Sequence, residues 1–249
     1  MTLPIALQTY TVREQFGRDF KGSVQRVAAM GYRALEITFE IPGVKPKAAA
    51  KLFRELTLAV PSAHLPLPLG KNERPVLDFA RQFGLSYLVA MHGPNDFKSL
   101  DQIRHICDQY NQAAAVAARH GLSVAYHNHW WEFGMVEDRL AFDVMLEHLD
   151  PAVGFEVDTY WVRAAGHDPA AVVQRLGQRA PLLHIKDGPA TLEEPMVAVG
   201  QGVLDFPAIV AAASGAQWLV VELDRCATDM LTAVEQSHRY LVQEGLGHA

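Results

Sequence analysis

Short apolar runs alternate with longer amphipathic segments along the whole chain. A short run rich in Val, Ile and Leu, without a helical period, is typical of a strand that is buried on both faces of a parallel sheet. Such runs occupy residues 5–8, 34–38, 58–64, 87–92, 122–127, 153–158, 182–186 and 218–223. The pattern therefore predicts eight strands.

The segments between these runs carry the spacing and the end signals of helices. Gly31, Gly84 and Gly121 each follow a helix-like segment, and glycine is preferred just past a helix end. Asp168 and Asp205 stand where an N-cap is expected, with a proline close behind each of them. The predicted helices span residues 20–30, 45–56, 72–83, 100–120, 139–149, 168–176 and 230–244, and one more begins at residues 205–207.

The order of strand and then helix, repeated eight times, indicates the architecture. Alternating strands and helices imply a parallel sheet, and eight such units imply a closed (β/α)8 TIM barrel. A doubly wound open sheet is the second choice, and it is disfavoured because no Gly-x-Gly-x-x-Gly turn follows the first strand. No Ser- or Gly-rich linker interrupts the units, so we predict one α/β domain over residues 1–249.

Composition and charge narrow the class of protein. The chain has 249 residues, a hydrophobic fraction of 49% and a net charge of -6, which allows a large core but gives no basic surface for nucleic acid or anionic membranes. Its two cysteines are too few for a disulfide framework. We see neither a secretory signal nor an apolar run of membrane-spanning length, and so we expect a cytoplasmic protein.

The stretch 122–133 combines a buried strand with a polar end. After the apolar run come His127, Asn128 and His129, with Glu132 just beyond. Because strand residues alternate between faces, His127 and His129 point to the same side and Asn128 points to the other. Buried polar atoms need partners, and metal ligation would supply them. The alternative is a polar loop past the strand end, in which the histidines bond to the backbone.

Other predicted strands end in the same way. In a barrel of this type the carboxyl ends of all the strands surround one active site, so polar groups at those ends converge from distant parts of the chain. Imidazoles and carboxylates without a thiolate suit one divalent ion such as Mn, Mg, Co or Zn, and not a cysteine-type structural zinc site. The polar residues at these other ends are His64, His92, Glu156, Asp158, His184, Lys186, Glu222 and Asp224.

Three of these residues are the strongest candidates for metal ligands. Asp158, His184 and Glu222 each end a nearly continuous apolar strand, where an unpaired polar group would be costly. His64 is harder to assign, because a lone histidine at a strand end is more often a hydrogen-bonded core residue. Lys186 is equally consistent with a salt bridge to a nearby carboxylate. The carboxylates expected within its reach are Asp187, Glu156 and Asp158.

Short motifs that occur in a fixed order over nearly the whole chain carry a family resemblance. They are Leu7-Gln8-Thr9-Tyr10-Thr11-Val12-Arg13, Ala34-Leu35-Glu36-Ile37, Ser62-Ala63-His64, Tyr126-His127-Asn128-His129, Val157-Asp158-Thr159, His184-Ile185-Lys186-Asp187, Gly200-Gln201-Gly202 and Val221-Glu222. With these motifs the chain resembles the xylose-isomerase-like superfamily of sugar isomerases, epimerases and inosose dehydratases. The resemblance implies a TIM barrel that binds one divalent metal ion.

The resemblance also implies a ligand set for the metal. In the sugar epimerases of the superfamily, a Glu, an Asp, a His and a Glu from the fifth to the eighth strands hold the ion, and the last three match Asp158, His184 and Glu222. On the fifth strand this chain has His127 where the epimerases have Glu, as inosose-dehydratase-like members also do. We take His127 as the fourth ligand and keep Glu132 as the alternative.

The function that the resemblance implies is proton transfer next to the carbonyl of a ketose or keto-sugar, by a metal-dependent sugar isomerase or epimerase. Glu222 and Glu132 would move the proton, and Lys186 would neutralise the developing oxyanion. The alternatives are an inosose-type dehydratase, in which β-elimination follows the same proton abstraction, and a sugar-binding barrel without metal. The residues expected to contact the substrate are His64, His92, His129 and Trp161.

The expected partner is a small sugar or cyclitol, and a free sugar is favoured because no Gly-rich phosphate-binding loop is evident. Nucleic acid is not expected, because the abasic-site endonucleases of the superfamily need a histidine where this chain has Trp161. The sequence does not determine the oligomeric state, and a homodimer is compatible with it.

Overall fold

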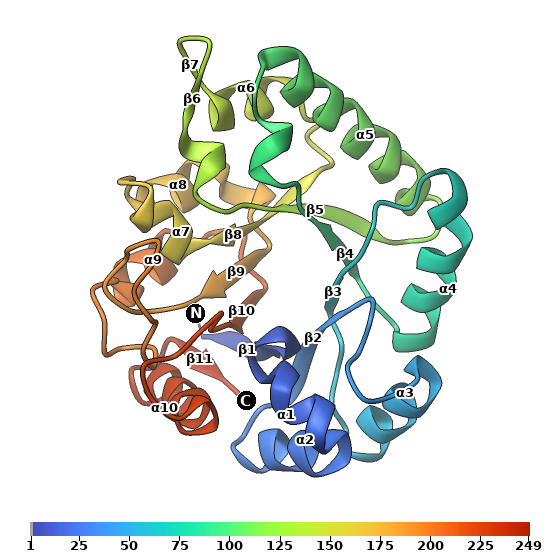
Figure 1. The fold of residues 1–249 in the computed structure, drawn as a ribbon, viewed down its shortest axis with the longest axis vertical. Helices are drawn as coiled ribbons and strands as arrows, with labels where there is room; N and C mark the ends of the chain where they lie inside the picture. Colours follow the sequence, from blue (N-terminus) through green and yellow to red (C-terminus); the bar gives the residue numbers. More distant parts are fainter. Residues whose placement is uncertain (1) are drawn as a thin grey trace.

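Each of the eight apolar runs forms a parallel strand in the computed structural model, which describes residues 2–249. Each strand pairs with the next along the chain, and the last pairs back with the first through Leu7 and Val221, which closes the barrel (Figure 1). The predicted (β/α)8 barrel is therefore confirmed. The barrel strands are β1 Leu3–Gln8, β2 Ala34–Thr38, β3 Ser62–His64, β4 Tyr87–Ala90, β5 Ser123–His127, β8 Gly154–Asp158, β9 Leu182–Ile185 and β10 Trp218–Val221.

Helices form a ring around these strands (Figure 1). They shield the outer faces of the strands with a continuous apolar core, which explains why the strands read as uninterrupted apolar runs. No helix in residues 2–249 is both long and apolar enough to cross a membrane. The helices are α1 Arg13–Arg18, α2 Phe20–Ala29, α3 Pro46–Glu55, α4 Glu73–Phe83, α5 Leu100–Ala118, α6 Ala141–His148, α7 Thr159–Ala164, α8 Pro169–Leu176, α9 Phe206–Ala212 and α10 Met230–Gln243.

The observed elements agree with the predicted bounds to within about two residues at each end, except for the third strand. The strand expected over 58–64 is regular only from Ser62, because Pro61 has no N–H to donate; its carbonyl instead accepts from the N–H groups of Ser86 and Tyr87. The helix expected from residue 139 starts at Ala141.

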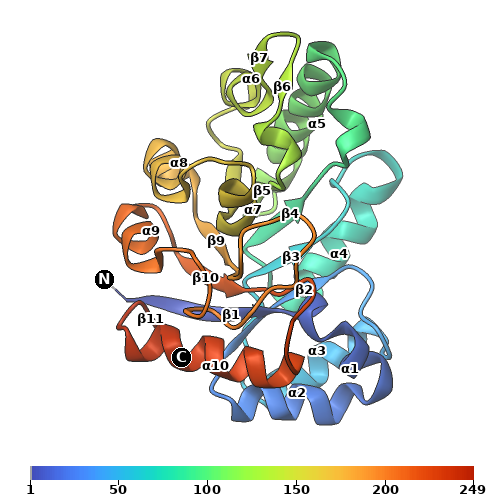
Figure 2. The same ribbon diagram turned by 60° about the vertical axis from the view of Figure 1, so that its left-hand side comes forward.

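A small hairpin occupies the start of that helix segment. Its strands are β6 Met135–Val136 and β7 Arg139–Leu140, and they pair antiparallel. The turn places Glu137 and Asp138 at positive φ angles of 47° and 65°, the conformation that a two-residue hairpin turn requires. At the other end of the chain, β11 Gly247–His248 pairs with β1 beside α10 (Figure 2).

The deeper part of the barrel interior is apolar. Two groups of side chains meet there, and each group includes residues of strands that do not pair directly, so these side chains lie inside the barrel. Trp218 contacts both groups and fills the space between them. One group consists of Ala6, Ala34 and Val220, and the other of Val89, Ala125 and Leu182.

A polar layer lies above this apolar layer, towards the carboxyl ends of the strands. Because side chains alternate along a strand, the residue two positions further on points into the same interior. On five of the strands that residue is polar and buried. These residues are Gln8, Glu36, His127, His184 and Glu222.

Candidate metal centre

Four side chains from the ends of β5, β8, β9 and β10 converge at the mouth of the barrel. They are His127, Asp158, His184 and Glu222, which we call the mouth group, and one ligand atom from each lies within 4.8 Å of the others. All four are buried. The structure thus brings together the complete ligand set predicted from the sequence, at a spacing that one ion could bridge.

Asp158 is positioned by the start of α7. One of its oxygens, Oδ1, accepts the N–H of Trp161 at 3.0 Å and caps that helix. The other oxygen, Oδ2, makes no well-aligned hydrogen bond; it forms an ion pair with Lys186 Nζ at 2.9 Å and lies 3.9 Å from His127 Nε2. The Asn128 amide bonds to the backbone N–H and C=O of Asp158, so the ends of β5 and β8 are held together from the opposite face of β5.

His184 lies between two carboxylates. Its Nδ1 is 2.9 Å from Glu222 Oε2, and its Nε2 is 2.7 Å from Glu36 Oε1. Glu36 also accepts hydrogen bonds from Gln8 and Ser62, which fix it in place. A carboxylate behind an imidazole orients the ring and raises its strength as a ligand, so Glu36 suits His184 to bind through Nδ1.

His127 has a similar support. Its Nδ1 lies 2.9 Å from Glu156 Oε2, and its Nε2 faces Asp158. Burial lowers the pKa of His127 well below its ordinary value, and the nearby His184 and His64 lower it further. The imidazole is therefore neutral, which is the form that binds metal.

Lys186 is the buried cation beside the mouth group. Its Nζ lies 2.9 Å from Asp158 Oδ2, 2.6 Å from Glu222 Oε2 and 2.9 Å from Asp224 Oδ2. Burial lowers the pKa of Lys186, but the three carboxylates raise it by more, so it ends well above its ordinary value. Of the salt bridges expected from the sequence, the one with Asp158 forms.

Asp187 does not pair with Lys186. Its carboxylate accepts the backbone N–H groups of residues in the following loop, three of them at 2.9 Å. It therefore fixes that loop beside β9 instead of joining the cluster of charges. The donors are Gly188, Gly200, Gly202 and Leu204.

Glu132 lies outside the mouth group. It is fully buried, and its two oxygens accept from Tyr126 Oη at 2.7 Å and from the backbone N–H of His129 at 2.8 Å. The side chain thus ties the loop after β5 to the strand. His129 stacks on Trp131 with ring centroids 4.2 Å apart, and burial lowers its pKa to about 3.

The structure brings three of the four residues that were expected to contact the substrate close to the mouth group or to its charged neighbours. His64 Nε2 lies 2.7 Å from Glu156 Oε2, the ring of His129 lies 4.9 Å from that of His127, and the Trp161 ring lies 5.5 Å from Lys186 Nζ. His92 lies apart. Its Nδ1 is 3.4 Å from Asp96, and it lines an outer cavity of about 520 Å³ with residues of α5.

Two buried carboxylates behind the mouth group are absent from our sequence-based list of ligands and catalytic residues. Glu36 and Glu156 are fully buried and contact the imidazoles of His64 and His184. The signal was present, because each is an acidic residue inside an otherwise apolar run. A charged residue in such a place needs a partner of opposite charge or a metal.

These observations fit a divalent ion. The mouth group offers two imidazoles and two carboxylates without a thiolate, and the buried Asp158 Oδ2 is held by an ion pair with Lys186 without a well-aligned hydrogen bond. The chain was then compared with known proteins. A family model described as the xylose isomerase-like TIM barrel matches residues 24–243. The chain belongs to this family. It is a family of enzymes that includes sugar isomerases and epimerases.

Individual relatives of this xylose isomerase-like barrel agree with that result. A sugar phosphate isomerase/epimerase from Parabacteroides distasonis is 25% identical with a TM-score of 0.84, over 97% of this chain and 94% of that one. An inosose dehydratase from Lactiplantibacillus plantarum is 27% identical over 160 residues, which are 55% of this chain. They are 53% of the relative, so the chain spans about half the length of the curated relative it matches.

A more distant structure shares the fold alone. The IolI protein, whose structure has a bound zinc atom, is 15% identical to this xylose isomerase-like barrel. Its TM-score is 0.72, and the match covers 97% of both chains. The presence of zinc is a property of that protein.

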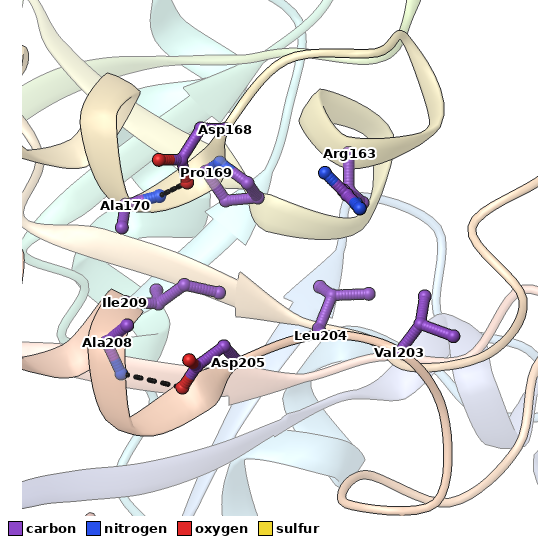
Figure 3. A pocket seen from close by; sticks show the side chains of 9 residues that line it. All are labelled: Arg163, Asp168, Pro169, Ala170, Val203, Leu204, Asp205, Ala208 and Ile209. Carbon is purple, nitrogen blue, oxygen red and sulfur yellow. Dashed lines mark hydrogen bonds between the residues drawn. The ribbon is translucent and has the colours of Figure 1, made fainter.

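One cavity of this xylose isomerase-like barrel lies away from the mouth group. It has a volume of about 280 Å³ and lies between α7, the start of α8 and the start of α9 (Figure 3). Asp168 and Asp205 use their oxygens there to cap the two helices, through Ala170 and Ala208. We assign no function to this cavity, because its two carboxylates already serve the helix ends.

A pair of variants distinguishes the two candidates for the fifth-strand ligand. We expect His127→Ala to weaken the binding of Mn²⁺, because His127 belongs to the mouth group. We expect Glu132→Gln to spare the metal and to slow turnover, because Glu132 holds the loop that carries His129. Isothermal titration with Mn²⁺ and steady-state assays measure both effects. The opposite pattern would make Glu132 the ligand.

The buried Glu132 also predicts a pH dependence of stability. Burial raises its pKa from 4.5 to about 8, only partly opposed by its hydrogen bonds. The folded chain therefore binds a proton more tightly than the unfolded chain, so this contribution is complete below pH 4.5 and is lost as the pH rises through about 8. The slope is at most about 1.4 kcal/mol per pH unit. Urea unfolding measures the free energy of unfolding from pH 5 to 8. We expect the wild-type chain to lose stability over this range and Glu132→Gln to lack that part of the loss. The same pH dependence in both proteins would contradict the raised pKa of Glu132.

Proposed function

We propose that this chain is a divalent-metal-dependent enzyme that transfers a proton next to the carbonyl of a keto-sugar, as a sugar isomerase or epimerase does. The observation that supports it most is the mouth group beside the buried ammonium of Lys186. A divalent ion held by the mouth group would lower the free energy of the negative charge that develops on a substrate oxygen. Side chains around the ion would then transfer the proton and neutralise the charge on the substrate.

Glu222 is the side chain proposed to move the proton. It is the most accessible member of the mouth group, with 6% of its side chain exposed. Burial raises the pKa of Glu222, but Lys186 and His184 lower it by more, so the carboxylate is ionised. Movement of the Lys186 ammonium towards a substrate oxyanion would raise the pKa of Glu222 again, just when a base is needed.

Lys186 is proposed to neutralise the developing oxyanion. It pairs with Asp224, which keeps 26% of its side chain exposed and lines a cavity of about 260 Å³ together with Thr11 and Arg13. The ammonium is therefore anchored on the side of the cluster that opens to solvent. An ammonium held by several carboxylates is oriented before the substrate arrives, so only a short movement towards the oxyanion is needed during the reaction.

The walls of the site offer polar atoms for substrate hydroxyls. Trp161 Nε1 and His129 Nδ1 are buried and have no hydrogen-bond partner. We propose that both contact the sugar, and that Glu132 acts through His129 as a positioning residue. Aromatic rings beside such polar atoms suit the mixed apolar and hydroxylated faces of a sugar.

Dehydration of an inosose-like ketone is the second candidate. The mouth group has His127 at the fifth strand, so Glu222 is its only glutamate. Elimination needs one base to abstract the proton, whereas epimerisation needs acid–base groups on both faces of the carbon. The similarity to an inosose dehydratase supports this alternative as well.

Deuterium uptake tests the proposed proton transfer. We expect the Mn²⁺-loaded protein, screened in D₂O against ketoses, keto-glycosides and inososes, to put deuterium at the carbon next to the carbonyl. Isomerisation, epimerisation and elimination all pass through loss of that proton. Mass spectrometry of recovered substrate and product measures the label. Turnover without deuterium would contradict proton transfer and would indicate a hydride shift.

Metal content separates the enzyme from a sugar-binding barrel. We expect the purified chain to bind about one equivalent of divalent metal, because the mouth group has space for one ion. Chelation should abolish turnover, and added Mn²⁺ should restore it. A chain that binds sugars equally well with and without metal, and that never turns them over, would support the binding module instead.

A further inference from the structure

Three imidazoles converge on a single carboxylate oxygen one layer below the mouth group. His64 Nε2, His127 Nδ1 and His184 Nε2 lie 2.7, 2.9 and 3.0 Å from Glu156 Oε2. One ligand atom from each of these four residues lies within 4.8 Å of the others. We call them the inner group. Glu156 precedes Asp158 by two residues on β8, so it points into the same interior at a deeper level.

Hydrogen bonding within the protein satisfies only part of this inner group: His64 Nε2 bonds to Glu156 and His184 Nε2 bonds to Glu36, but other atoms remain without a partner. Glu156 Oε2 faces three nitrogens, whereas Glu156 Oε1 is buried without any partner. His127 Nδ1 is also buried and lacks a well-formed hydrogen bond. Buried polar atoms are almost always paired, and three nitrogens with one carboxylate oxygen form a typical ligand set for a metal ion.

The inner group and the mouth group use opposite nitrogens of the same two rings. His184 presents Nδ1 to Glu222 and Nε2 to Glu156, while His127 presents Nε2 to Asp158 and Nδ1 to Glu156. A ring that binds an ion through one nitrogen keeps its proton on the other. One ion can therefore occupy either position, but the two positions exclude each other.

The two positions differ in ligand chemistry. The inner group has three imidazoles and one carboxylate, which favours zinc, whereas the mouth group has two carboxylates and lies beside Asp224 and the Lys186 ammonium. Oxygen-rich sites favour harder ions such as Mn²⁺ and Mg²⁺. We propose that the barrel contains an inner, zinc-selective position formed by His64, His127, Glu156 and His184, which competes with the mouth position.

Access to the inner position is through His64. Its side chain is 11% exposed, whereas those of His127, Glu156 and His184 are at most 2% exposed. An ion enters past the His64 ring and is then enclosed. Zinc in the inner position would take His127 and His184 away from the mouth group, so it would block Mn²⁺ there. This inference goes beyond the proposed function, and the inner position itself does not depend on it.

Two matched variants of the full chain test the proposal. His64→Gln replaces an imidazole that only the inner group uses by a neutral amide, which is a much weaker ligand for zinc, and Asp158→Asn does the same to a carboxylate that only the mouth group uses. Titration of the metal-stripped proteins measures the affinity for Zn²⁺ and for Mn²⁺. We expect His64→Gln to lower the affinity for Zn²⁺ by more than about 100-fold and to leave the affinity for Mn²⁺ unchanged. Loss of a residue that only supports a ligand costs at most about 100-fold, and loss of the ligand itself should cost more. We expect Asp158→Asn to do the reverse.

X-ray absorption of the zinc-loaded wild-type chain, combined with the affinities of the variants, decides between the two positions. Three imidazoles around zinc, with Mn²⁺ binding lost on zinc loading, would support the inner position. Two imidazoles, with zinc affinity lost in Asp158→Asn, would overturn it and leave the proposed mouth position standing. Zinc held by three imidazoles in a chain that never binds Mn²⁺ would support the inner position and contradict the proposed function.

Discussion

Replacing Glu222 by glutamine is expected to lower turnover by about 10²–10⁴-fold while part of the metal affinity remains. The amide oxygen of glutamine can still ligate an ion, but the amide cannot take up a proton at neutral pH. Glu222 Oε2 lies 2.9 Å from His184 Nδ1 and 2.6 Å from Lys186 Nζ, so the change affects a single well-defined atom. Steady-state assays and metal titration on the same protein separate the two effects.

Asp224→Asn is the matched control for this variant. Asp224 shares the contact to Lys186 but lies outside the mouth group. We expect it to keep full metal affinity and to lose less turnover than Glu222→Gln. Equal losses in the two variants would show that the charge around Lys186 matters, and not a base at Glu222.

Replacing Lys186 by methionine is expected to destabilise the metal-free chain by about 3–5 kcal/mol, as is usual when one partner of a buried ion pair is removed. The change leaves Asp158, Glu222 and Asp224 without their cation in a buried cluster. A divalent ion supplies the missing positive charge, so Mn²⁺ should restore much of the lost free energy of unfolding. The Mn²⁺ affinity itself should rise, because the ammonium no longer competes for the two carboxylates of the mouth group.

Chemical unfolding with and without Mn²⁺ measures this effect. Lys51→Met serves as the control, because Lys51 pairs with Glu55 on an exposed helix face and such pairs contribute at most about 1 kcal/mol. A loss in Lys186→Met that is the same with and without metal would contradict the role of Lys186 as the charge partner of the metal site.

The period of two along the strands predicted that His127 points into the barrel. His127 shares a face with Ala125, and Ala125 indeed lies in the apolar layer inside the barrel. Asp158, His184 and Glu222 follow the same rule. Strand number and chain order then predicted the closed barrel, because every local signal indicated a strand or a helix of the right length.

The depth of each polar group could not be predicted, because depth depends on the register between strands. Glu36 pairs in register with Gln8, and His127 with Glu156, so these carboxylates lie behind the imidazoles instead of at the rim. A single sequence contains no direct record of register. The whole of α7 was also missed, although its N-cap contact is local: Asp158 Oδ1 accepts the backbone N–H of Trp161, three residues further on.

A crystal structure of the chain loaded with Mn²⁺, with its anomalous signal, tests the central claim most directly. We expect one peak about 2.0–2.3 Å from atoms of His127, Asp158, His184 and Glu222, with the Lys186 ammonium moved towards Asp224. A peak bound by Glu132 in place of His127 would correct one ligand. A mouth group without a peak, with Lys186 still paired to Asp158 and Glu222 at saturating Mn²⁺, would contradict the metal centre itself.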